Sequence, residues 1–192
     1  MSGNSPQRFD LFTVCLHWLT ASGYVGLFAI GWYMVEPTYY DSLYNTLPSL
    51  HKSLGMLLLL IVPLQLVWRL GRNGPAPLPD QTVWQIAAAR LMHWTLLVGT
   101  LGVLASGYLI PTAQGAGISV FDWFSVPAVV SDLPQQEDIA GDVHRYLSYA
   151  IGVLALGHTL IALKHHFYDG DATLRRILGL KVTDRTHRQS AG

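Results

Sequence analysis

Charge is scarce in this chain, and cysteine is almost absent. Only 12% of the 192 residues are Asp, Glu, Lys or Arg, which is about half the fraction usual in soluble domains. The twelve acidic and twelve basic residues cancel, so no field of one sign suggests a nucleic-acid partner. The single cysteine, Cys15, cannot form an internal disulfide, and we expect its thiol to serve packing. Low charge together with 51% hydrophobic residues indicates a chain whose solvent is membrane lipid.

Four apolar stretches are long enough to cross a bilayer, which takes about 20 residues of helix. The first is too long for the apolar core of a signal peptide, so we interpret it as a retained helix. The sequence therefore predicts an all-α membrane protein, a bundle of four transmembrane helices within residues 1–180. The predicted helices are about 13–35, 51–70, 88–110 and 143–167, and a polar tail occupies 181–192.

The connections are marked by residues that interrupt helices. Pro37 and Pro48 bracket the first connection, and 71–79 is rich in glycine and proline. In the long third connection, 117–127 is more apolar than an exposed loop should be, and we expect it to lie in the membrane interface as a cap over the outer site. The chain after Asp169 is polar, and we expect it to be loosely held.

Basic residues are distributed unequally between the two predicted faces, and cytoplasmic loops carry an excess of Lys and Arg. The face with the termini and the second connection holds ten of the twelve: Arg8, Arg69, Arg72, Arg90, Lys164, Arg175, Arg176, Lys181, Arg185 and Arg188. The other face holds only Lys52 and Arg145. Both termini are therefore predicted to be cytoplasmic.

Histidines are the most informative polar residues, because ionisable groups inside a bilayer are costly and usually functional. His144 and His158 are fourteen residues apart in the fourth span. That separation is just under four helical turns and about 21 Å of depth, on one face. His51 opens the second span at the outer side, and His17 lies in the first turns at the inner side. The depths therefore pair His51 with His144 and His17 with His158.

Two neutral imidazoles that face each other across a bundle core are a site for haem iron. Two such pairs on one helix predict two b-type haems on opposite sides of the membrane, which would conduct electrons. Zinc is an alternative, but structural zinc takes four ligands close together. A channel or metal transporter without haem is a further alternative, in which the histidines would line a path instead of pairing at two depths.

Other polar residues complete the prediction. Lys52 and Arg145 directly follow the two outer histidines, and each could pair with a haem propionate, attract an anionic substrate or extend to the interface. His93, with Arg90 one turn earlier, is the first candidate for binding a propionate or a quinone. Three further histidines have weaker cases: His165, His166 and His187.

The motifs and their order resemble the bacterial cytochrome b561 family over nearly the whole chain. They are LHWL at 16–19, LHKSLG at 50–55, ARLMH at 89–93, SGY at 106–108, ISVF at 118–121, VP at 126–127, GH at 157–158, ALKHHF at 162–167 and DATLRR at 171–176. The resemblance implies a four-helix bundle with two haems b, and ligand pairs that match His17 with His158 and His51 with His144.

The resemblance also suggests what the protein does. One type of member oxidises superoxide at the outer face and reduces ubiquinone in the membrane, so an oxidoreductase is expected. Other relatives resemble membrane anchors of hydrogenases and formate dehydrogenases. The first connection is similar to a branch whose members are often found beside a periplasmic isoprenoid-binding protein. We expect a di-haem carrier between a periplasmic donor and the quinone pool, with an anchor subunit or a partner of that binding protein as the alternatives.

Overall fold

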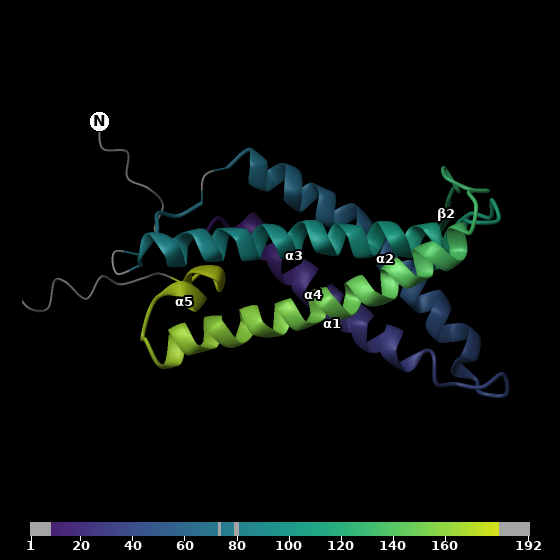
Figure 1. Cartoon of the computed structure of the whole chain (residues 1–192), viewed down its shortest axis with the longest axis horizontal. Helices are drawn as coiled ribbons and strands as arrows, with labels where there is room; N and C mark the ends of the chain where they lie inside the picture. Colours follow the sequence, from purple (N-terminus) through teal and green to yellow (C-terminus); the bar gives the residue numbers. More distant parts are fainter. Residues whose placement is uncertain (1–8, 73, 79–80, 181–192) are drawn as a thin grey trace, which may run out of the picture.

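Four long helices form the molecule, as the sequence predicts (Figure 1). The computed structural model describes residues 9–72, 74–78 and 81–180; the predicted tail at 181–192 lies outside them. The helices are α1 (Leu11–Tyr33), α2 (Leu43–Leu70), α3 (Val83–Leu109) and α4 (Gln136–Phe167). Each is long and apolar enough to span a membrane. A short helix, α5 (Thr173–Ile177), and a two-stranded hairpin complete the described fold.

The third helix begins at Val83, about five residues earlier than predicted, and the second and fourth helices begin earlier still relative to prediction, at Leu43 and Gln136. Pro48 lies inside α2 instead of ending the first connection. The backbone bond that it removes is near the helix start, where the lost partner is easily replaced by water. The acidic residues that start α4 favour the positive end of the helix dipole. Both helices are therefore longer than the hydrocarbon thickness of about 30 Å.

This extension corrects the predicted positions of two histidines. His51 does not open its helix, and His144 does not lie at the end of its helix. With Leu43 and Gln136 as the first residues, each histidine is the ninth of its helix. Each side chain is therefore about 12 Å along the axis from its helix start. The two histidines keep a common depth, which lies within the bundle and not at its rim.

The third connection folds into a hairpin of β1 (Ile118–Val120) and β2 (Phe124–Val126) at one end of the bundle (Figure 1). Its inward residues Ile118 and Val120 are buried against Met56 of α2. The Phe121 amide donates to the hydroxyl of Ser53 over 3.1 Å. Ser53 is two residues after His51. The apolar stretch predicted as a cap is thus packed on the half of α2 that carries His51.

The opposite end gathers the start of α1, the second connection and α5 (Figure 1). The Trp18 indole donates to the Ile177 carbonyl over 3.1 Å, and the Arg176 guanidinium donates to the Ala76 carbonyl over 2.7 Å. The segment after Asp169 is therefore not loosely held as far as Leu180, which corrects the sequence-based expectation. Residues of this segment bond to other parts of the chain, and its polar sequence did not indicate these contacts.

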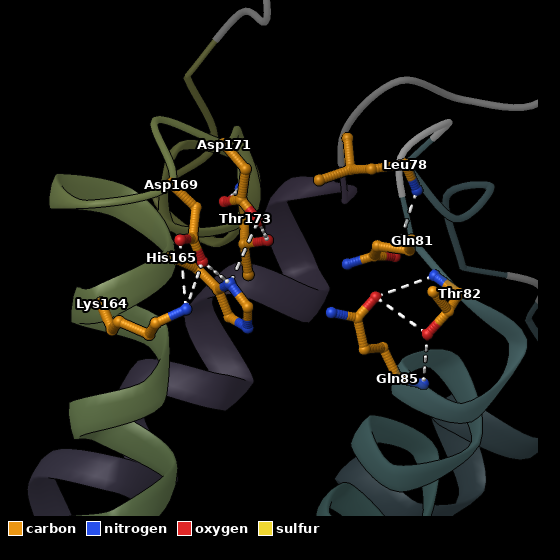
Figure 2. Close-up of polar contacts among 9 residues, drawn as sticks. All are labelled: Leu78, Gln81, Thr82, Gln85, Lys164, His165, Asp169, Asp171 and Thr173. Carbon is orange, nitrogen blue, oxygen red and sulfur yellow. Dashed lines mark hydrogen bonds and ion pairs between the residues drawn. The ribbon is translucent and has the colours of Figure 1, made fainter.

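Polar contacts fix the helix ends on this side (Figure 2). Thr82 and Gln85 form a reciprocal capping box at the start of α3. At the end of α4, the Asp169 carboxylate accepts from Lys164 over 2.9 Å and lies 2.6 Å from His165 Nδ1. The Lys164 ammonium holds the pKa of Asp169 below its ordinary value. Because this carboxylate is exposed, the contact orders the turn more than it stabilises the fold.

The helices pack in two close pairs, α1 with α2 and α3 with α4, and α2 joins them through α3. The central apolar cluster contains Leu27, Leu58, Val62, Leu97 and Leu104. It draws on α1, α2 and α3, while α4 buries only Gln136, Ala140 and Ile151 along its 32 residues. The side of α4 that faces the bundle is therefore sparsely filled by protein side chains.

Glycine makes the contact between α3 and α4 possible. A Cβ at Gly99 would overlap Ile151 Cδ1, and it would lie 2.9 Å from Ile151 Cγ1. We expect Gly99→Ala to lower the free energy of unfolding by about 1–3 kcal/mol, as overpacking does. Thermal unfolding in detergent checks this. Gly141→Ala is the control, because nothing lies within 4 Å of the added methyl on α4; equal losses in the two variants would contradict the packing explanation.

Candidate haem-binding site

The two outer histidines face each other from α2 and α4. The ring centres of His51 and His144 are 6.1 Å apart and the rings are nearly perpendicular, at 85°. Both side chains are half-buried. An imidazole nitrogen lies about 2 Å from a transition metal that it binds, so two axial nitrogens are about 4 Å apart with ring centres farther apart. The observed separation accommodates a metal atom between the rings.

The polar partners of these rings differ. Nδ1 of His144 lies 2.8 Å from the Val103 carbonyl of α3. Such a bond orients the ring and leaves Nε2 as the nitrogen free to bind a metal. Nδ1 of His51 is buried without a hydrogen bond of good geometry, although the Leu27 backbone is within electrostatic reach. Since buried polar atoms usually have a partner, this ring is only partly satisfied by the protein alone.

At the predicted inner level, two histidines are in contact and a third is nearby. The rings of His93 and His158 are 5.1 Å apart, and His17 lies within electrostatic reach of both. Sequence reasoning found no partner for His93. The depth of a residue along its helix does not show which other helix is its neighbour. The imidazole in ring contact with His158 is thus that of His93, and the pairing of His17 with His158 stays a prediction.

Sequence reasoning also missed Arg69. Its half-buried side chain lies over the Trp94 ring, with the guanidinium carbon 5.1 Å from the ring centre. Its charge reaches His17 and His93. Arg90, the cation that the sequence favoured here, is exposed. The position of Arg69 distinguishes it from Arg90. Gln65 accepts a hydrogen bond from Thr20 of α1 over 2.7 Å and therefore faces the bundle. Arg69 is one turn farther along the same face of α2.

The other predicted polar residues lie as follows. Lys52 and Arg145 are exposed, each next to an outer histidine. His165 contacts Asp169, as described above, and lies 3.8 Å from Asp171. His166 is half-buried with an unpartnered Nδ1. His187 falls outside the described residues, and Cys15 has a free, exposed thiol.

Open space adjoins two glycines that lie near the histidines. A Cβ at Gly55, one turn after His51, or at Gly157, next to His158, would meet nothing within 4 Å. An apolar groove of about 310 Å³ between α1 and α2 is lined by residues such as Leu19, Gly26 and Leu57, and no histidine lines it. The fit to haem therefore rests on the imidazoles and the open glycine positions, not on this groove.

Residues 9–72, 74–78 and 81–180 contain no set of ligands for a zinc ion. In these segments no three His, Cys, Asp or Glu side chains are grouped to hold a metal ion. Paired imidazoles, an orphaned ring nitrogen and space beside each pair fit a macrocycle that brings four of its own nitrogens to the metal.

Comparison with known proteins agrees with this geometry. A family model described as prokaryotic cytochrome b561 matches residues 8–180. The chain belongs to the prokaryotic cytochrome b561 family. It is 42% identical to cytochrome b561 homolog 2 of Escherichia coli (strain K12), over 94% of this chain and 96% of that protein. It is 25% identical to cytochrome b561 homolog 1 of the same organism, over 90% and 97%.

The predicted resemblance is thereby confirmed. Membership makes the chain a multi-pass membrane cytochrome and implies haem b and electron transfer. The outer imidazole pair and the inner histidine cluster are the described groups that suit haem b in this member of the b561 family. Fold and family do not fix the donor or the acceptor.

Proposed function

We propose that this cytochrome carries electrons across the bacterial cytoplasmic membrane through two haems b, between a periplasmic-side donor and the quinone pool. The observation that carries the proposal is the facing of His51 and His144, with a second histidine cluster fourteen residues farther along α4. When bound, haem b supplies a one-electron couple whose potential the protein tunes. The excess of basic residues at the end with α5 favours a cytoplasmic location for that end.

His51 and His144 would hold the outer haem, and His17 and His158 the inner one. His93 is also close to His158. The choice of His17 as the partner of His158 rests on the family resemblance and on the matching depths of the two residues in α1 and α4. His93 would instead donate a hydrogen bond to a propionate or to a quinone at the inner end.

Haem content tests the ligand assignment. His51→Ala and His144→Ala should each remove one of two haems, and His17→Ala and His158→Ala should each remove the other, because each variant loses one of the two imidazoles that would hold that haem and so binds it much less tightly. Haem per chain and reduced visible spectra measure this, with His165→Ala as the control that keeps both. Loss of the inner haem in His93→Ala, with retention in His17→Ala, would overturn the inner assignment. One haem or none in the folded parent protein would overturn the proposal.

Arg69 would tune the inner site. A cation near a haem favours its reduced form, because reduction lowers the positive charge. Removal of this charge should destabilise the reduced haem by about 1.7 kcal/mol at a separation of about 10 Å and an effective dielectric constant near 20, which is about 70 mV for one electron. We expect Arg69→Gln to lower one of the two midpoint potentials by that order. Arg90→Gln, at an exposed position, is the control; equal shifts in both variants would refute a local role.

Lys52 and Arg145 would attract a small anionic donor such as superoxide to the outer haem. Both are exposed beside the outer ligands, on a face otherwise poor in positive charge. We expect Lys52→Gln combined with Arg145→Gln to slow superoxide oxidation about tenfold at low salt and to flatten its salt dependence. Stopped-flow reduction measures this, with Arg90→Gln as control. An unchanged rate at low salt would exclude this donor and direct attention to a protein donor.

A further inference from the structure

The ring of His144 lies directly against the backbone of α3. Its Nδ1 is 2.8 Å from the Val103 carbonyl, and Gly107 is four residues later in the same helix. In an α-helix, the side chain at that position leans back over the turn that contains the carbonyl. A Cβ at Gly107 would lie 2.8 Å from His144 Cε1 and 2.9 Å from Nδ1. Any residue except glycine would therefore displace the ring from the carbonyl.

His51 also lies close to a glycine, on the other helix pair. A Cβ at Gly31 of α1 would lie 3.1 Å from His51 Cε1 and 3.6 Å from Nδ1. Unlike the Nδ1 of His144, the Nδ1 of His51 is buried without a hydrogen-bond partner. A glycine of the neighbouring helix thus lies against each of the two histidines, Gly31 of α1 against His51 and Gly107 of α3 against His144.

Other close glycines of these helices have ordinary packing partners. A Cβ at Gly23 would lie 3.1 Å from Leu58 Cδ1, between α1 and α2. A Cβ at Gly102 would lie 3.0 Å from Leu147 Cδ2, between α3 and α4. Gly23 and Gly31 lie between the same two helices, as do Gly102 and Gly107, and the distances to the neighbouring side chain are similar. The difference is that the neighbour is a leucine at Gly23 and Gly102 and a histidine at Gly31 and Gly107.

We propose that Gly31 and Gly107 are positioning residues for the outer haem ligands. By lacking a side chain, they let the rings of His51 and His144 lie against the backbones of α1 and α3. For His144, the Val103 carbonyl then orients the ring and leaves Nε2 as the nitrogen free to bind a metal. This inference rests on the proposed role of His51 and His144 as ligands. Orientation of a ligating imidazole by a backbone carbonyl fixes its tautomer and raises its basicity.

Alanine variants at the four glycines test this. Gly31→Ala and Gly107→Ala should shift the low-spin electron paramagnetic resonance g-values of the outer haem and speed its transfer to apomyoglobin about tenfold or more. The inner haem should be unchanged, because no added methyl is near it. Gly23→Ala and Gly102→Ala should leave the signals and loss rates of both haems as in the parent protein. Parent-like outer-haem g-values and loss rates in both Gly31→Ala and Gly107→Ala would overturn the inference.

A double-variant cycle keeps the test decisive if Gly107→Ala accumulates poorly. Combined with His144→Gly, the added methyl no longer meets a ring, so the thermal midpoint of the pair should equal that of His144→Gly alone. An equal loss from Gly107→Ala with and without His144 would show that the contact is not with this ring and would refute the inference. Failure of the proposed function is distinguished beforehand, because the parent protein would then lack the outer haem.

Discussion

An α-helix has a constant rise per residue, so α4 determines the two depths at which its histidines lie. Fourteen residues separate His144 from His158, which is nearly four turns and about 21 Å along the axis. The two imidazoles therefore leave one face of one helix at two levels. Every other feature of the site is arranged around these levels: His51 on α2 meets the outer one, and His17 and His93 meet the inner one.

Packing explains why the histidines can meet across the bundle. The close pairs α1 with α2 and α3 with α4 depend on glycines that bring backbones together, while α4 contributes few buried side chains of its own. The result is a bundle whose central apolar cluster lies on α1, α2 and α3, while α4 is less covered by protein side chains. Such a bundle has room for a planar group beside each imidazole, and apolar helices around it keep the local dielectric low.

The sequence was sufficient for the four spans and for the levels of the histidines, because hydropathy and helical rise are local properties. It failed at helix starts, where Pro48 and the acidic residues of α4 looked like connections but are compatible with helix outside the hydrocarbon. It also missed α5 and its anchoring to Trp18. The proximity of His93 and Arg69 to the inner histidines could not be predicted either, since it depends on which helices are neighbours and how each is rotated.

The distance between the two haem irons tests the central claim most directly. It can be measured by pulsed dipolar electron paramagnetic resonance on the oxidised protein in detergent. If α4 carries one ligand of each haem, fourteen residues apart, the distance should be about 20 Å, and the signal should disappear when either level loses its haem. A protein with two haems at a much shorter distance, or without any dipolar coupling between them, would contradict the account of one helix that supports two levels.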